Sequence, residues 1–260
     1  MLSAKSITYK IGKKTLLDQV SVNFEPGKLN LIIGPNGAGK STLVKALCNQ
    51  IHPETGMISL GNKSIKEYTA LKLGQIRSVL SQNIDLTFPL NVWEVVMMGR
   101  YPHFNVKPAK LDEQACEDAM RFFDVLDFAE RNYMTLSGGE KQRVHFARVM
   151  AQIWYPVKGS CRYLIMDEPL TFLDVYYQYQ FMHKVVEILQ ADDIVVVGVV
   201  HDLNLAARFA DKLILINHGK ILSEGTKEEV LTTENIKTAY RLTPVLIEDK
   251  EKGLLNLFFE

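Results

Sequence analysis

Residues 34–42 form a glycine-rich loop that follows a short apolar run at residues 29–33. The loop matches the pattern G-x-x-x-x-G-K-[ST] and reads Gly34, Pro35, Asn36, Gly37, Ala38, Gly39, Lys40, Ser41 and Thr42. In this pattern the backbone N–H groups point at phosphates, the lysine reaches the β- and γ-phosphates, and the first hydroxyl ligates Mg²⁺. A chance glycine turn between a strand and a helix is the alternative, but the lysine and the paired hydroxyls favour nucleotide binding. Thr42 is expected to touch the α-phosphate.

Two adjacent carboxylates, Asp167 and Glu168, end a second apolar run at residues 163–166. A carboxylate at the end of a buried strand suits Mg²⁺, and a neighbouring carboxylate suits a general base. We expect Asp167 to hold the metal through a water and Glu168 to polarise the attacking water. An acidic turn at a strand end is the alternative, which the upstream phosphate loop makes less favourable.

A third motif, Leu136, Ser137, Gly138, Gly139 and Glu140, lies between these sites, and here the chain resembles the ATPases of ABC transporters. The resemblance extends to Gln82 as the Q-loop residue, Asp174 as the end of the D-loop and His201 as the switch histidine. It implies an α/β fold, namely a P-loop NTPase of the ABC ATPase type. That fold has a RecA-like core, an N-terminal antiparallel β part and an inserted helical subdomain.

The resemblance also implies a head-to-tail homodimer that sandwiches two ATP molecules. In such a dimer, Ser137, Gly138, Gly139 and Glu140 serve the nucleotide held by the second copy, and Asp174 also lies at that nucleotide. Bare backbone and a hydroxyl at the start of a helix make an anion site, which agrees with this role. Gln82 is implied to contact Mg²⁺ and to act in catalysis together with Glu168 and His201.

His201 stands apart from the other histidines by its position, because it follows a continuous apolar run at residues 194–200. Such a run is typical of a central parallel strand, whose carboxyl end is where ligands bind in open α/β sheets. By resemblance, His201 contacts the γ-phosphate. We interpret the remaining histidines as structural or solvated.

Two positions depart from the family pattern. Ile11 occupies the place of the aromatic residue that stacks on adenine, and Tyr9, on the same strand face, is a substitute for which core packing is the alternative. In the D-loop, the bulky Phe172 replaces a small residue, whereas Asp174 is retained.

The order of the motifs predicts a single ABC ATPase domain over residues 1–260. Within it we expect a nucleotide-binding core at 1–88 and 155–225, a helical subdomain at 89–154, and a C-terminal helix and hairpin at 226–260. Strands are expected near 6–9, 29–33, 76–80, 163–166, 194–200 and 213–216. Helices are expected at 92–98, at 111–123 and after the third motif. The acidic stretch 112–118 is interpreted as an exposed helical face.

Composition limits the partners. The 30 Lys and Arg residues balance the 30 Asp and Glu residues, so no net basic charge indicates nucleic acid. The longest apolar run, residues 194–200, is too short to span a bilayer, and no signal-peptide pattern begins the chain. The three cysteines fit no zinc spacing and suit a reducing cytoplasm. Together with these observations, the resemblance to transporter ATPases implies a peripheral protein at the cytoplasmic face of the inner membrane.

The segment after Gln82 resembles the importers for haem, ferric siderophores and cobalamin, on the residues at 88–92, 94–96 and 99–103. In those systems the neighbouring surface receives a permease helix, which makes Met97, Met98, Arg100 and Tyr101 candidate contacts. The long stretch 153–161 resembles the haem importers in particular. The expected function is ATP-driven haem uptake with two permease subunits and an external substrate-binding protein. Import of a ferric siderophore or cobalamin, or a soluble ABC ATPase without a transport role, remain the alternatives.

Overall fold

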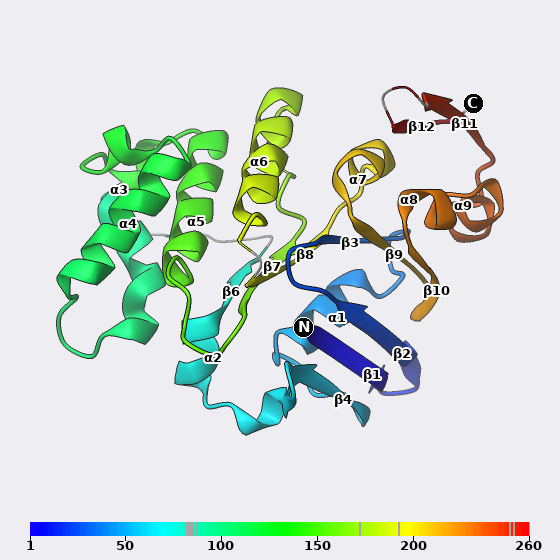
Figure 1. Cartoon of the computed structure of the whole chain (residues 1–260), viewed down its shortest axis with the longest axis horizontal. Coiled ribbons are helices and arrows are strands. Elements are labelled where there is room, and N and C mark those ends of the chain that lie inside the picture. The colour runs from blue at the N-terminus through cyan, green and yellow to red at the C-terminus, as the bar shows by residue number, and fades with distance from the viewer. Residues whose placement is uncertain are drawn as a thin grey trace. The chain divides into compact units, whose positions relative to one another are not determined.

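The computed structural model describes residues 1–81, 86, 88–171, 173–191, 193–249, 251 and 253–259 (Figure 1). The predicted residues Gln82 and Phe172 lie outside this part of the chain. The chain forms two compact units, one made of residues 1–67 and 195–260 and the other of residues 68–194. This division differs from the expected boundaries, since the second unit contains strands and further helices besides the helical segment 89–154.

The first unit begins with an antiparallel sheet in the strand order β2-β1-β4-β5. Its strands are β1 (Leu2–Ile11), β2 (Lys14–Phe24), β4 (Thr55–Leu60) and β5 (Lys63–Ser64). In β2 the residues Val20, Val22 and Phe24 are buried and alternate with exposed polar residues, which is the pattern of a strand covered on one face. The predicted N-terminal antiparallel part is therefore present.

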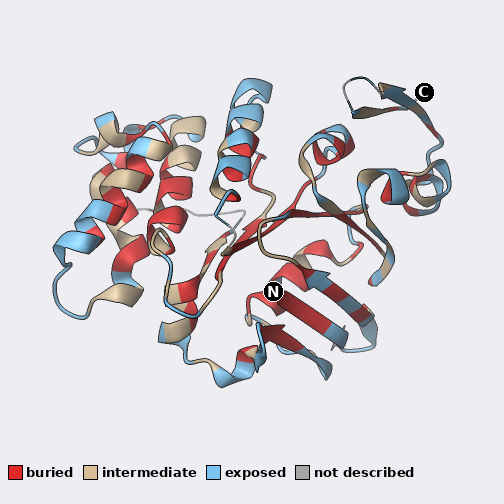
Figure 2. Ribbon diagram, in the orientation of Figure 1, coloured by how far each residue is buried: buried red, intermediate tan, exposed pale blue. Residues whose placement is uncertain are grey.

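The same unit contains the strand that precedes the phosphate loop. This strand, β3 (Leu29–Ile33), is fully buried and runs parallel to its neighbours β8 (Ile194–Val199) and β9 (Lys212–Asn217). Strand β10 (Lys220–Gly225) pairs antiparallel with β9. Buried parallel strands read as continuous apolar runs, which is why the sequence located them. Figure 2 shows β3, β8 and β9 as mostly buried.

Short helices follow these strands and lead to the C-terminal end. Helix α1 (Lys40–Leu47) follows β3, a 3₁₀ turn covers Ile65–Glu67, and α7 (Leu203–Phe209) follows β8. Helices α8 (Lys227–Val230) and α9 (Thr233–Tyr240) precede the hairpin of β11 (Pro244–Asp249) and β12 (Leu254–Phe259). The hairpin was predicted, and Asn204 of α7 binds it by exchanging two hydrogen bonds with the backbone of Leu257.

The second unit combines two parallel strands with a group of helices. Strand β6 (Arg77–Leu80) pairs with β7 (Arg162–Asp167). The helices are α2 (Ala70–Ile76), α3 (Val92–Met97), the 3₁₀ helix η2 (Met98–His103), α4 (Lys110–Phe122), α5 (Gly138–Gln152) and α6 (Val175–Ile188), with 3₁₀ turns at Leu126–Phe128 and Tyr133–Thr135. The helix expected after the third motif is α5, which buries Val144, Ala147, Val149 and Met150.

Two expectations for this unit are wrong. Arg100 was a candidate permease contact and Asp112 was placed on an exposed face, yet their side chains are 4% and 5% exposed. They form an ion pair, with Arg100 Nη2 2.8 Å from Asp112 Oδ1. Burial of both charges is tolerated because each charge meets its opposite and hydrogen bonds satisfy the rest. Tyr101, by contrast, is 58% exposed, as a surface contact requires.

Within the described part of the chain, every helix is too short or too polar to cross a bilayer.

Candidate functional site

The phosphate loop joins the buried strand β3 to α1 through backbone that only glycine adopts easily. Gly34, Gly37 and Gly39 have φ values of 150°, 77° and 111°, in a region that L residues rarely enter. At Gly34 a Cβ would lie 2.2 Å from the carbonyl oxygen of Ile216, so a side chain is also excluded by β9. At Gly37 no described atom lies within 4 Å of a Cβ, so the loop is open there. These features fit a cradle for phosphate groups.

Lys40 begins α1, and its side chain folds over the loop. It is 5% exposed, and its Nζ donates hydrogen bonds to the carbonyl oxygens of Gly34 at 2.8 Å and Pro35 at 3.1 Å. The ammonium group is thus held at the loop by carbonyl acceptors. Ser41 and Thr42 lie in the first turn of α1, where both are half-buried. Helix α1 has Gly39 at its N-cap position with no side-chain cap hydrogen bond, which suits an anionic ligand at the helix start.

His201 follows strand β8, the neighbour of β3. The two strands run parallel in register, with Ile32 opposite Val199, and Val200 N donates to Ile32 O at 3.2 Å. The phosphate loop and His201 therefore leave the same edge of the sheet, as the sequence predicts. His201 is exposed, and Asp202 beside it caps α7 by accepting hydrogen bonds from the N–H groups of Asn204 and Leu205. The cap fixes the backbone direction directly after His201.

Tyr240 is a residue at the phosphate loop that the sequence reasoning missed. It is the last residue of α9, its hydroxyl forms a hydrogen bond with the backbone of Gly34, and burial raises its pKa to about 12. No spacing connects it to the loop, because α9 is brought there by the fold of the C-terminal part. Tyr240 therefore stays neutral and supports the loop through its hydroxyl.

Tyr9, the candidate for stacking on adenine, is half-buried in β1 opposite Leu17 of β2. Ile11, the alternative, is 61% exposed. Neither observation selects between adenine contact and core packing, so the role of Tyr9 stays a prediction.

In the second unit, the carboxylates Asp167 and Glu168 lie at the end of β7, whose preceding residues are all buried. Glu168 has a φ of 53°, an uncommon conformation for a residue with a side chain. Thr171 Oγ1 donates to Glu168 O at 3.0 Å and Gln142 Nε2 donates to Pro169 O at 2.8 Å, so side chains on both sides hold this turn. A strained backbone held by several partners is typical of a functional turn.

The third motif, residues 136–140, forms the start of α5, and we call it the signature loop; α5 is the signature helix. Ser137 is the N-cap residue, with Oγ accepting from Glu140 N at 3.3 Å, while Glu140 Oε2 accepts from Ser137 N at 2.7 Å. This reciprocal capping box lowers the pKa of Glu140, chiefly through the Ser137 backbone N–H. Arg131 adds an ion pair at 3.5 Å. The helix start is thus ordered by its own residues, and the roles of Ser137, Gly138, Gly139 and Glu140 toward nucleotide stay predictions.

Asp174, the predicted end of the D-loop, is the N-cap residue of α6. Its Oδ1 accepts a hydrogen bond from Tyr177 N at 3.0 Å. Gln178 Nε2, one turn on, donates to the carbonyl oxygens of Leu170 at 3.3 Å and Leu173 at 3.0 Å, which anchors the segment between β7 and α6. The predicted partner in catalysis and metal binding, Gln82, cannot be placed because it lies outside the described residues.

Comparison with known proteins gives a consistent result. A family model described as ABC transporter matches residues 17–171. A hemin import ATP-binding protein, HmuV, of Gloeobacter violaceus is 42% identical over 253 residues, which are 97% of this chain and 92% of the relative. The proteins of the same name from Bordetella avium and Escherichia coli O157:H7 are 39% and 36% identical, over 98% and 96% of this chain and 97% and 95% of theirs.

Solved structures agree on the fold. A chain of an inward-facing ABC transporter of the metal-chelate type has a TM-score of 0.83 at 25% identity, covering 100% of this chain and 96% of that chain. A bacterial ABC transporter cassette, solved as a dimer, has a TM-score of 0.75 at 24% identity, covering 87% and 99%. The fold class predicted from the motifs is confirmed.

Proposed function

Because the chain belongs to the ABC transporter family and is one of its ATPases, we propose that it powers the import of haem through separate permease subunits. The observation that carries this proposal is the likeness to hemin import ATP-binding proteins over 97% of the chain. The phosphate loop, the carboxylate turn and the signature helix supply the parts that such an ATPase uses. The resemblance seen at residues 99–103 and 153–161 supports the same cargo.

ATP is held first by the loop of residues 34–42. Its backbone N–H groups and Lys40 bind the phosphates, and Thr42 touches the α-phosphate. Ser41 and Gln82, with Asp167 acting through a water, would hold Mg²⁺. Bound Mg²⁺ neutralises charge that develops on the phosphate oxygens. Glu168 orients and deprotonates the attacking water, and His201 contacts the γ-phosphate. Tyr9 covers the adenine in this arrangement.

The working form is a head-to-tail dimer with two ATP molecules. In it, Ser137, Gly138, Gly139 and Glu140 of one copy meet the ATP bound by the loop of the other, with Asp174 nearby. The positive end of the α5 dipole favours an anion at that place. The exposed position of Gly138, where no described atom lies within 4 Å of a Cβ, leaves the backbone accessible to a ligand from outside. A single copy is expected to hydrolyse ATP slowly.

The membrane partners are two permease subunits, with an external substrate-binding protein acting through them. Tyr101 of η2 is 58% exposed and is retained as a permease contact, together with the half-buried Met97 and Met98, whereas Arg100 is not. The chain is placed at the cytoplasmic face of the inner membrane as a peripheral subunit, with no nucleic acid as partner.

The test is growth of the source organism without this gene on haem, on a ferric siderophore or on free iron as the sole iron source. Loss of growth on haem alone, restored by the wild-type gene but not by Lys40→Ala or Glu168→Gln, is the expected result. Loss on the siderophore, or of cobalamin-dependent growth, would replace the cargo and keep the mechanism. Normal growth on every source would favour a soluble ABC ATPase, which should also leave detergent extracts without a membrane partner.

A further inference from the structure

The last residue of the signature helix, Gln152, fastens three elements of the second unit at one point. Its side-chain Nε2 donates hydrogen bonds to the carbonyl oxygens of Gly74 at 2.7 Å and Arg77 at 2.9 Å. Gly74 lies in the last turn of α2, and Arg77 is the first residue of β6. Because Nε2 has two N–H groups, both are used. The end of α5 is therefore tied to the turn from α2 into β6.

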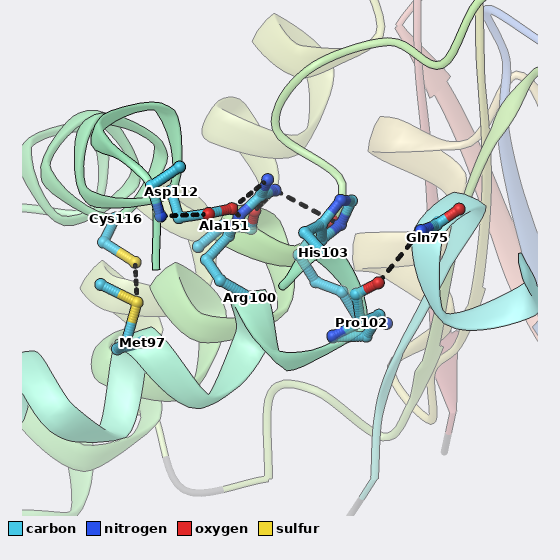
Figure 3. A network of polar contacts seen from close by, with 10 residues as sticks. Gln75, Met97, Arg100, Pro102, His103, Asp112, Cys116 and Ala151 are labelled. Atoms are coloured by element: carbon cyan, nitrogen blue, oxygen red, sulfur yellow. Dashed lines mark hydrogen bonds and ion pairs between the residues drawn. The ribbon is translucent and has the colours of Figure 1, made fainter. Parts of the chain in front are cut away.

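The main-chain oxygen of the same residue ties α5 to η2. Gln152 O accepts a hydrogen bond from His103 Nε2 at 2.7 Å and one from Arg100 Nη1 at 3.4 Å, while Arg100 Nη1 also donates to Ala151 O at 2.8 Å. These oxygens lie at the C-terminal end of α5, where helix carbonyls lack partners within the helix. Burial, and then the charge of Arg100, lowers the pKa of His103. Because the partner is a carbonyl oxygen, the ring donates to it through Nε2–H. Figure 3 shows Arg100 directed at Ala151.

Helix η2 is also held from its other side. Gln75 Nε2 of α2 donates to Pro102 O at 3.1 Å, as Figure 3 shows. At the start of η2, a Cβ on Gly99 would lie 2.1 Å from Arg148 O, so η2 and α5 touch through backbone. Helix η2 is thus bound to α2 and to α5 at once. At Gly99 the two backbones leave no room for a Cβ between η2 and α5.

The buried ion pair makes this junction stiff. Arg100 Nε donates to Asp112 Oδ1 at 2.9 Å, and Asp112 Oδ2 accepts from Ala109 N at 2.9 Å at the start of α4. Both side chains are nearly inaccessible to water, so moving one away from the other leaves an uncompensated charge in the interior. Helix α4 therefore moves with η2.

The elements that meet at this junction lead to three functional segments. Helix η2 carries the exposed Tyr101, α5 begins at the signature residue Ser137, and β6 ends at Leu80, two positions before Gln82. A displacement imposed on η2 can be passed on through packed side chains and hydrogen bonds, and Gln152 supplies the hydrogen bonds from α5 to the start of β6. Without its two donors, the end of α5 loses its hydrogen bonds to Gly74 and Arg77, while η2 keeps its bonds to α5 and the bond from Gln75.

We infer that Gln152 is a positioning residue that couples the permease-facing helix η2 and the signature helix to the strand leading to Gln82. This inference rests on the proposed transporter function. It assigns Gln152 no contact with ATP. Gln152 affects how well a displacement of η2 by the permease is transmitted to the ATP-binding residues. It therefore affects the amount of haem moved per ATP hydrolysed.

The test uses Gln152→Met, which keeps the side-chain length and removes both donors. The variant is prepared with the permease that co-purifies from detergent-extracted membranes and is placed in proteoliposomes with hemin as the probe. ATP hydrolysis, with and without the permease, and hemin uptake are measured together. We expect the ATPase of the isolated chain to be unchanged, while its stimulation by the permease and the uptake per ATP both fall about tenfold.

Gln114→Met is the matched control, because Gln114 is exposed and its Nε2 donates to Asp118 within the same helix, α4. It should keep the wild-type stimulation. Gln75→Met, which removes only the bond to Pro102, is the second variant if Gln152→Met does not fold, and it should lower the stimulation in the same direction.

Four outcomes overturn the inference or its premise. Unchanged stimulation and uptake per ATP in Gln152→Met would overturn the inference. So would a lower Tm with ATPase and uptake falling in proportion, since that is a structural role alone. A wild-type complex that is stimulated by the permease but moves no hemin would remove the haem proposal and still test Gln152 through the stimulation ratio. A wild-type chain that no permease stimulates would remove both.

Discussion

The phosphate loop and the signature loop are both glycine and hydroxyl runs that open a helix, yet they are built in opposite ways. The glycines of the first have positive φ values, and Gly34 and Gly39 also lie against neighbouring strands. In helix α1 the N-cap residue is Gly39, and no side chain caps the helix start by a hydrogen bond. Helix α5 begins with Ser137, which forms a complete capping box with Glu140.

Runs of glycine and hydroxyl residues can therefore build two different kinds of helix start. A helix start whose N–H groups meet no capping side chain is prepared for a ligand that supplies the acceptors. A helix start with a capping box is stable before any ligand arrives, as a surface presented to a second molecule must be. The phosphate loop is therefore expected to bind ATP in the single chain, and the signature loop to act only once a second copy is present.

The strongest way to break this comparison is to place the same methyl group in each loop. Gly34→Ala forces a Cβ within 2.2 Å of Ile216 O, at a φ that alanine avoids, so we expect a loss of about 3 kcal/mol in unfolding free energy and no measurable ATP binding. Gly138→Ala meets no described atom within 4 Å and should fold and bind ATP as the wild type. Urea unfolding and calorimetric ATP titration measure both. Equal losses of unfolding free energy and ATP affinity in the two variants would show that the two loops depend on glycine in the same way.

Lys40 tests the ligand-binding half of the comparison. Lys40→Ala removes a buried ammonium group that already lies at the loop carbonyls, and charged hydrogen bonds contribute about 1.5–3 kcal/mol. ATP affinity should therefore fall roughly 10- to 100-fold. Lys45→Ala, an exposed lysine in the last turn of the same helix, is the control and should keep the wild-type Kd. An unchanged Kd in Lys40→Ala would contradict the role given to the loop.

Ser137 tests the other half. Ser137→Ala removes the side-chain half of the capping box, which should lower the unfolding free energy by about 1 kcal/mol. ATP affinity of the single chain should not change, whereas ATP turnover at concentrations that favour the dimer should fall. Calorimetry and the concentration dependence of ATPase activity separate the two effects. Weaker ATP binding in the single chain would place Ser137 at the nucleotide of its own copy.

The sequence predicted the parts of this molecule that local patterns encode. Buried parallel strands are continuous apolar runs, so β3, β7, β8 and β9 were located within one residue or so of their observed ends. The helix start at Ser137 was also expected, from a hydroxyl that opens a helix, whereas the cap at Asp174 was not predicted. The motif residues fall where such elements end, at the edges of the sheet.

The sequence did not predict contacts between residues that are distant along the chain. Arg100 and Asp112 read as surface charges, because each was judged without its partner, and only packing brings them together inside the second unit. Tyr240 reaches Gly34 from the far end of the chain. Gln152 belongs to no sequence motif. Its contacts with α2, β6 and η2 arise only because these elements meet at the end of α5.

The smallest expected effect concerns the charge of Glu140, and it sharpens the comparison because α1 has no equivalent carboxylate. The Ser137 backbone N–H, followed by the Ser137 hydroxyl, holds the pKa of Glu140 below its usual value of 4.5 in the folded chain. A lowered folded pKa gives stability that is present above pH 4.5 and lost as the pH falls through the folded pKa. Glu140→Gln should therefore destabilise slightly at pH 7, and its difference from the wild type should shrink at pH 3.5, as urea midpoints would show. Ser137→Ala keeps the backbone bond, the larger cause, and should retain most of the wild-type pH dependence. A pH-independent difference between Glu140→Gln and the wild type would mean that the carboxylate caps α5 by shape and not by charge.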